Sequence, residues 1–162
     1  MNTTSAAPSG HIPRLKQWAT VPPFVLPSTA GGQTGPGALR SKYNVVLAFV
    51  EDSPQGGGYL LSLARAYQDI LRRQARLLVV VPLELHAATR LREELDLPYP
   101  LLVDPDARTT RRMLGAGNAN AVLVADRFGQ VYYLRVAPSA GALPSMSEAL
   151  DWLDYIQSEC PE

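Results

Sequence analysis

The sequence contains one cysteine, Cys160, and so one side chain that could act as a sulfur nucleophile. A single cysteine permits no disulfide within the chain and no cysteine-rich metal site. The neighbouring carboxylates of Glu159 and Glu162 disfavour the thiolate, which is the reactive form of the side chain. We therefore predict a passive exposed thiol at position 160, with a redox thiol that exchanges with a partner as the alternative.

A second segment of chemical interest is a polar, glycine-rich stretch made of Ser53, Pro54, Gln55, Gly56, Gly57 and Gly58. Glycines between a strand and a helix leave backbone N–H groups uncovered, and such groups can bind an anion or a phosphate. No Gly-Lys-Ser/Thr follows, so the pattern is not a P-loop, and Leu61 occupies the third glycine position of a dinucleotide motif. We expect a flexible or turn-forming segment here, with an anion site as the alternative.

The sequence shows neither the residue spacing of a metal site nor the catalytic set of a hydrolase. His11 and His86 have no histidine or cysteine nearby at ligand spacing. Asp104, Asp106 and Asp126 fall at positions where helix caps and turns favour aspartate for backbone reasons. We therefore assign these carboxylates structural roles and expect no metal, no cofactor and no Ser-His-Asp set.

The charges of the chain are balanced, with 15 basic and 15 acidic residues. Without an extended basic surface, the electrostatic basis for nucleic-acid binding is missing, so we expect no nucleic-acid partner. The first residues carry no apolar run of signal-peptide length, and no later segment approaches the roughly 20 apolar residues of a membrane span. The expected location is the cytoplasm.

Apolar runs alternate with amphipathic segments from residue 43 onward. Strands are expected where β-branched and apolar residues run together, at 43–50, 75–81, 99–103, 121–125 and 130–136. Helices are expected where apolar residues recur every three or four positions, at 58–74, 84–95, 105–114 and 146–156. This order predicts an α/β protein, a three-layer sandwich whose central mixed sheet has helices on both faces.

A chain of 162 residues, of which 46% are hydrophobic, has the size of one domain with a sizeable core. Residues 1–20 show neither helical nor strand periodicity, so we expect a polar N-terminal arm there, with Trp18 as its anchor. The globular domain is expected over residues 21–160.

Four short strings occur in a fixed order along this domain: Val21–Pro27 (VPPFVLP), Asn44–Phe49 (NVVLAF), Asp104–Asp106 (DPD), and Val122–Asp126 (VLVAD) with Gly129. Together they resemble the alkyl hydroperoxide reductase and thiol-specific antioxidant family, the redoxins or peroxiredoxin-like proteins of the thioredoxin superfamily. The C-terminal string CPE is similar to the tail of some bacterial redoxin-like proteins. The resemblance implies a thioredoxin-like fold over residues 21–160.

The resemblance also implies a catalytic cysteine after the first central strand, in a CxxC or TPxC string. Aligned on Pro54, Ser53 stands at the first position of that string and Gly56 stands where the peroxidatic or second cysteine would be. The string Gly117–Ala121 also lacks the cis-proline of thioredoxins and the arginine of peroxiredoxins. Because a serine oxygen cannot pass through sulfenic acid and disulfide states, we assign no catalytic residue and expect no peroxidase activity at this site.

The loss of the cysteine makes a non-catalytic role the leading hypothesis. We expect a protein-interaction module or an accessory subunit of a larger complex. Its partner would bind the proline-rich arm or the former substrate groove, where the candidate lining residues are Gly57, Gly58, Asn118 and Asn120. The alternative is a thiol-disulfide oxidoreductase or antioxidant protein that acts through Cys160.

Overall fold

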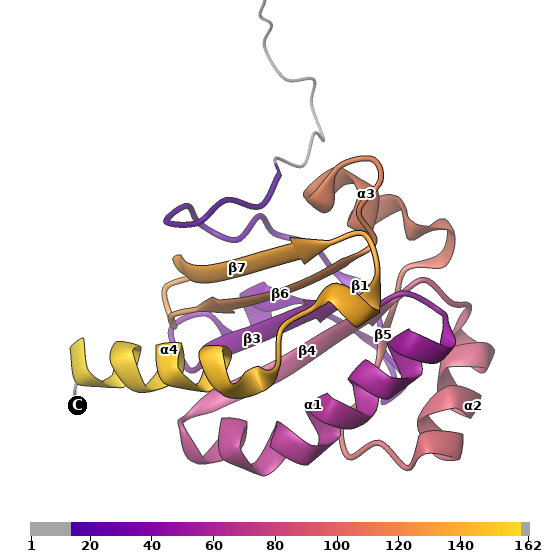
Figure 1. Ribbon diagram of the computed structural model, residues 1–162, viewed down its shortest axis with the longest axis horizontal. Coiled ribbons are helices and arrows are strands. Elements are labelled where there is room, and N and C mark those ends of the chain that lie inside the picture. Colours follow the sequence, from indigo (N-terminus) through magenta and orange to yellow (C-terminus); the bar gives the residue numbers. More distant parts are fainter. Residues whose placement is uncertain (1–13, 160–162) are drawn as a thin grey trace, which may run out of the picture.

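The computed structural model describes residues 14–159, and its centre is a five-stranded sheet in the order β5-β4-β3-β6-β7 (Figure 1). The three strands β3, β4 and β5 are parallel, whereas β6 is antiparallel to both of its neighbours. The strands of this sheet are β3 (Asn44–Phe49), β4 (Ala75–Val81), β5 (Leu102–Val103), β6 (Asn120–Ala125) and β7 (Val131–Ala137). The predicted mixed sheet of an α/β protein is confirmed.

The central strands β3 and β6 are buried along their whole length, because both faces of the sheet are covered. Alternate residues of β3 point into two different cores, with Val46 in one and Leu47 in the other. This arrangement explains why these strands are continuous apolar runs in the sequence rather than alternating patterns.

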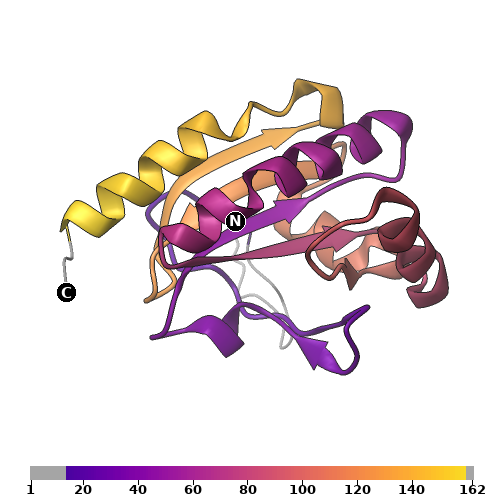
Figure 2. The same cartoon turned by 90° about the horizontal axis from the view of Figure 1, so that it is seen from below.

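Helices α1 (Pro54–Arg72) and α4 (Met146–Glu159) lie together on one face of the sheet (Figure 2). Their apolar stripes supply Leu63 and Leu153 to the larger core, and α2 (Leu85–Leu95) joins that core through Ala88. The opposite face is covered by α3 (Arg108–Leu114) and by the segment around Phe24. The three-layer arrangement expected from the sequence is therefore present.

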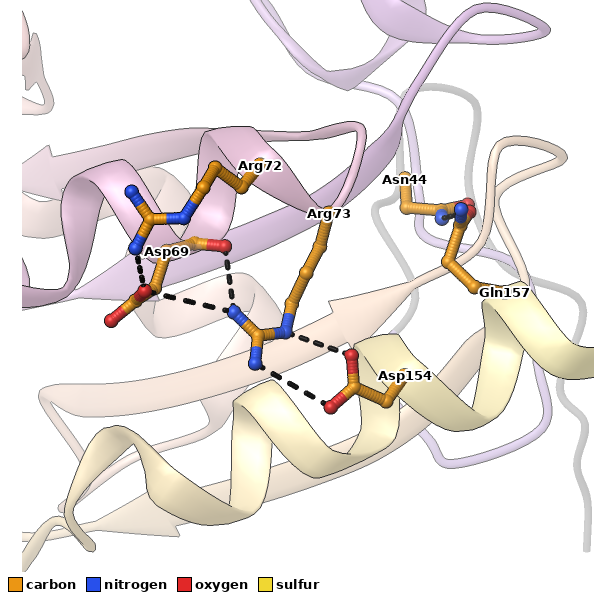
Figure 3. Close-up of polar contacts among 6 residues, drawn as sticks. All are labelled: Asn44, Asp69, Arg72, Arg73, Asp154 and Gln157. Atoms are coloured by element: carbon orange, nitrogen blue, oxygen red, sulfur yellow. Dashed lines mark hydrogen bonds and ion pairs between the residues drawn. The ribbon is translucent and has the colours of Figure 1, made fainter.

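An ion pair fastens α4 to the C-terminal end of α1 (Figure 3). The Arg73 guanidinium donates to both carboxylate oxygens of Asp154, at 2.9 and 3.5 Å. A third donor of the same guanidinium binds the carbonyl oxygen of Asp69 at 2.9 Å. Nearby, the Asn44 amide of β3 donates to Gln157 of α4 at 3.4 Å, so polar contacts link α4 to both α1 and the sheet.

The described part of the predicted arm, residues 14–20, runs beside β7 (Figure 1). The Trp18 N–H donates to the Val131 carbonyl at 2.7 Å, and the Val131 N–H donates to the Ala19 carbonyl at 2.9 Å. The Trp18 ring packs edge-on against Tyr132. Trp18 therefore anchors this segment as expected, while residues 1–13 lie outside the described residues.

Several boundaries differ from the sequence-based expectation. Helix α1 begins at Pro54 rather than near residue 58, and β5 is only two residues long. The expected helix from Pro105 is broken, because Asp106 and Ala107 have positive φ angles of 64° and 54°, and regular α-helix begins at Arg108. A small hairpin of β1 (Leu26–Pro27) and β2 (Gln33–Thr34) is additional.

Among the residues that the structure describes, no helix combines the length and the apolar character needed to cross a bilayer.

Candidate functional site

The segment that the sequence singled out leaves the end of β3 and enters α1, beside the start of β6. In the antiparallel register of these strands, Phe49 is paired with Ala121. This pairing places Asn120, the first residue of β6, next to the backbone that follows β3. The site is therefore built where two neighbouring strands and the N-terminus of a helix meet.

A closed hydrogen-bonded cluster of Glu51, Ser53 and Asn120 occupies this position. The Glu51 N–H donates to Asn120 Oδ1 at 2.9 Å, and Asn120 Nδ2 donates to Glu51 Oε1 at 2.8 Å. The Ser53 hydroxyl donates to Glu51 Oε2 at 2.7 Å. Both carboxylate oxygens of Glu51 are thus held by the side chains of other residues, and both amide atoms of Asn120 are used.

Ser53 also begins the helix, because it is the N-cap of α1 in extended conformation. Its Oγ accepts a hydrogen bond from the Gly56 N–H at 2.9 Å, and Pro54 follows at the first helical position. One hydroxyl therefore satisfies a free N–H of the helix and positions the Glu51 carboxylate at the same time.

These contacts lower the pKa of Glu51 below its ordinary value of 4.5. The main cause is the hydrogen bond from Ser53, followed by the one from Asn120, and burial acts in the opposite direction. The backbone N–H of Ala140 adds a further favourable contact to the carboxylate. The site thus carries a stabilised negative charge on a carboxylate that is partly open to solvent.

The glycine run lies inside the first turns of α1, so the expectation of a flexible or turn-forming segment is wrong. The reason at Gly56 is a close approach to the backbone, since a Cβ atom there would lie 2.0 Å from the Glu51 carbonyl oxygen. At Gly57 and Gly58, an added Cβ atom would have no other atom within 4 Å. Gly56 is the residue that the family resemblance suggests would correspond to the peroxidatic or second cysteine, and the present backbone has no room there for any side chain.

The short 3-10 turn Ala140–Ala142 closes one side of the site. A Cβ atom on Gly141 would lie 3.1 Å from the Gln55 side-chain amide, which shows how closely α1 approaches this turn. Ala140 is buried and Gln55 is exposed. The segment after β7 thus lies against the start of α1, and its Ala140 N–H reaches the Glu51 carboxylate.

The four residues proposed to line a groove have different surroundings. Asn120 is fully buried, and both polar atoms of its amide are hydrogen-bonded to Glu51. It is therefore a structural member of the cluster, and its amide is not available to a ligand. Asn118 is partly buried, and its amide donates to the Leu114 carbonyl at 3.4 Å. Gly58 is exposed on α1 and Gly57 is partly exposed.

The aspartates assigned to caps and turns have those roles in the structure. Asp104 accepts from the Thr109 and Thr110 N–H groups at 3.2 and 2.8 Å and so caps α3. Asp126 Oδ1 accepts from the Phe128 and Gln130 N–H groups, both at 2.9 Å, within the hairpin connection. The structural roles of Asp104 and Asp126 are confirmed, and Asp106 lies in the 3-10 turn Pro105–Ala107 with a φ angle of 64°.

Three residues named from the sequence, His11, Cys160 and Glu162, lie outside the described residues. Within residues 14–159, no group of three or more histidine, aspartate or glutamate side chains is arranged to hold a metal ion. The residue that sequence reasoning missed is Glu51, whose only signal was a carboxylate two positions before a Ser-Pro helix start.

No protein-family model matches the chain, and no curated protein matches it. Several solved structures, in contrast, have a similar fold. The peroxidoxin BcpB of Mycobacterium tuberculosis superposes with a TM-score of 0.76 at 19% identity, over 88% of this chain and 99% of that one. The reduced 2-Cys peroxiredoxin of Plasmodium vivax gives 0.75 at 17% identity, over 88% and 82%.

Peroxiredoxin Q of Xanthomonas campestris is also similar, with a TM-score of 0.67 at 14% identity over 83% of this chain and 90% of that one. Identities this low show a shared fold and carry no activity across. The mixed sheet, its helical layers and these structural neighbours together establish that this chain has the α/β thioredoxin-like fold that peroxiredoxins have.

Proposed function

We propose that this protein is a non-catalytic, peroxiredoxin-like module of the cytoplasm that acts by binding another protein, as an accessory subunit of a larger complex. The observation that supports this most directly is the Glu51–Ser53–Asn120 cluster at the position of the expected thiol. It fills the site with internal hydrogen bonds and contains no sulfur.

The chemistry available to the cluster argues against a replacement enzyme. Peroxide reduction by a protein thiol needs a sulfur atom that can be oxidised and then restored, and a carboxylate or hydroxyl oxygen has no such states. Ser53 is a poor nucleophile here because its oxygen already accepts from the Gly56 N–H, and because Glu51, which accepts its proton, has a lowered pKa and is therefore a weak general base. A retained fold with an internally satisfied site fits a binding role better than a catalytic one.

Peroxide turnover tests the proposal. Purified full-length protein and its Cys160→Ser variant are mixed with hydrogen peroxide or an organic hydroperoxide and a thiol reductant, and consumption is followed. We expect no consumption above the reductant alone for either protein. Turnover that persists in Cys160→Ser would refute the proposal, and turnover that disappears in that variant would favour the oxidoreductase that works through Cys160.

The binding role has its own test. Affinity purification from the native cell, followed by mass spectrometry, should recover a companion protein in stoichiometric amount. Recovery of the chain alone, at native expression level and in low salt, would argue against an accessory subunit.

A further inference from the structure

A cluster of four aromatic side chains joins the N-terminal segment, β7 and α4 on the molecular surface. We name Trp18, Tyr132, Trp152 and Tyr155 the aromatic cluster. Ring centroids lie 5.3 Å apart for Trp18 and Tyr132 and 5.5 Å apart for Trp152 and Tyr155, with edge-to-face angles of 70° and 79°. The remaining neighbour pairs lie 6.2 to 6.4 Å apart.

The aromatic cluster is only partly covered by the protein. Trp18 is 54% exposed and Tyr155 is 47% exposed, which is unusual for side chains of this size that already pack against one another. A surface hollow of about 520 Å³ lies over α4 and is lined by Glu148, Asp151, Trp152 and Tyr155. Exposed aromatic faces beside a hollow are typical of a binding surface.

The charge around this hollow is negative. The sequence of α4 contains carboxylates but no lysine or arginine. Asp154 is neutralised by Arg73, and Glu148 accepts from the Tyr133 hydroxyl at 2.8 Å and lies 3.8 Å from Arg135. Asp151 is exposed and forms no ion pair or hydrogen bond with the residues that the structure describes, so its charge is available to a partner.

An aromatic face next to a free carboxylate selects for a cation. A guanidinium can stack on a tryptophan or tyrosine ring and pair with a carboxylate at its edge, and it loses less hydration than an ammonium when it does so. The N-terminal residues 1–13 contain no lysine or arginine, so they lack the complementary charge for this surface. A partner protein with an exposed arginine would supply the complementary cation.

We infer that the aromatic cluster and Asp151 form the docking surface for a basic, arginine-bearing segment of the partner protein. This inference rests on the proposed function and specifies the chemistry of the partner. It also moves the expected interface away from the Glu51–Ser53–Asn120 cluster, because the docking surface lies on α4, β7 and the N-terminal segment.

The two tryptophans of the chain both belong to the aromatic cluster, so tryptophan fluorescence reports on this surface alone. Full-length protein is titrated with a blocked tetrapeptide of alternating leucine and arginine, and with the same peptide carrying glutamate in place of arginine. We expect a saturable fluorescence change with the arginine peptide, weakened by added salt, and none with the glutamate peptide.

Substitutions at exposed residues test where the peptide binds and are not expected to destabilise the fold. Asp151→Asn should weaken the arginine peptide about threefold to fivefold, as expected for a single exposed charge pair, and Asp151→Lys should weaken it further. Glu94→Gln, which removes an exposed carboxylate from α2, is the matched control and should bind like the wild type.

Three results would overturn the inference: no response to the arginine peptide, equal response to both peptides, or an Asp151→Lys variant that binds like the wild type. A concentration-dependent dimer that dissociates on Asp151→Lys, seen by sedimentation, would assign the surface to a second copy and also overturn it. None of these results changes the peroxide assay or the recovery of a native companion, so failure here is distinguishable from failure of the proposed function.

Discussion

Alanine in place of Gly56 tests the claim that this position has no room for a side chain. The added Cβ would lie 2.0 Å from the Glu51 carbonyl oxygen, 3.1 Å from its carbon and 3.3 Å from Val50 Cγ1. The first two of these atoms belong to the backbone and cannot move aside by rotating a side chain. Relief requires the first turn of α1 to shift away from the end of β3.

The magnitude follows from two opposing effects. Alanine is favoured over glycine in a helix by up to about 1 kcal/mol. Overpacking that forces a backbone shift costs about 1–3 kcal/mol, and the shift also disturbs the Gly56 N–H bond to Ser53. We expect Gly56→Ala to destabilise the protein by about 1 kcal/mol, a fall in melting temperature of about 2–4 °C for a chain of this length.

Gly57→Ala and Gly58→Ala are the matched controls, since a Cβ at either position meets no atom within 4 Å. Each should raise stability by up to about 1 kcal/mol through helix propensity and the reduced freedom of the unfolded chain. The assay is urea denaturation of all three variants followed by circular dichroism. A Gly56→Ala variant as stable as Gly57→Ala would refute the reasoning about the close approach.

Three further predictions concern hydrogen bonds made by the side chains of Glu51, Tyr99 and Asp104. Because its hydrogen bonds depress the Glu51 pKa, the folded state binds that proton less readily than the unfolded chain, so wild-type stability should fall as pH drops below 4.5. Urea titrations between about pH 3 and 6 should show a flatter dependence for Glu51→Gln. Tyr99→Phe removes the 2.7 Å bond from a buried hydroxyl to the Leu60 carbonyl and should cost about 1 kcal/mol by urea denaturation, with unchanged circular dichroism. Asp104→Ala removes the cap of α3, including its bond to the Thr110 N–H, and should lower the free energy of unfolding by about 1–2 kcal/mol in the same experiment. An unchanged urea midpoint would contradict the capping role.

Strands with continuous apolar runs were the easiest features to predict from the sequence. The run Ala75–Val81 coincides with β4 because burial on both faces leaves a signal that needs no partner to be recognised. The run at 99–103 was misleading, since Tyr99 is buried against α1 and only Leu102 and Val103 pair with β4. Its apolar character reflects burial in a loop rather than strand pairing.

The start of α1 is hard to predict from the sequence because two local signals disagree. Ser53 followed by Pro54 is a strong helix start, whereas three consecutive glycines have poor helix propensity. The disagreement is resolved by the tertiary contact at Gly56, which no local pattern contains. The same holds for the bond between Glu51 and Asn120, which joins residues 69 positions apart and exists only because β3 and β6 are neighbours in the sheet.

The hydrogen bonds of this site indicate that a single substitution to cysteine would not create a reactive thiol. A reactive thiolate needs free donors, usually the N–H groups at a helix start, to stabilise its charge. Here the Gly56 N–H is taken by Ser53, and the Ser53 hydroxyl and the Asn120 amide are taken by Glu51. A cysteine at position 56 would meet the Glu51 carbonyl and would place its negative charge near an ionised carboxylate, which raises the pKa of a thiol. The donors that could serve a nucleophile thus stabilise the fold instead.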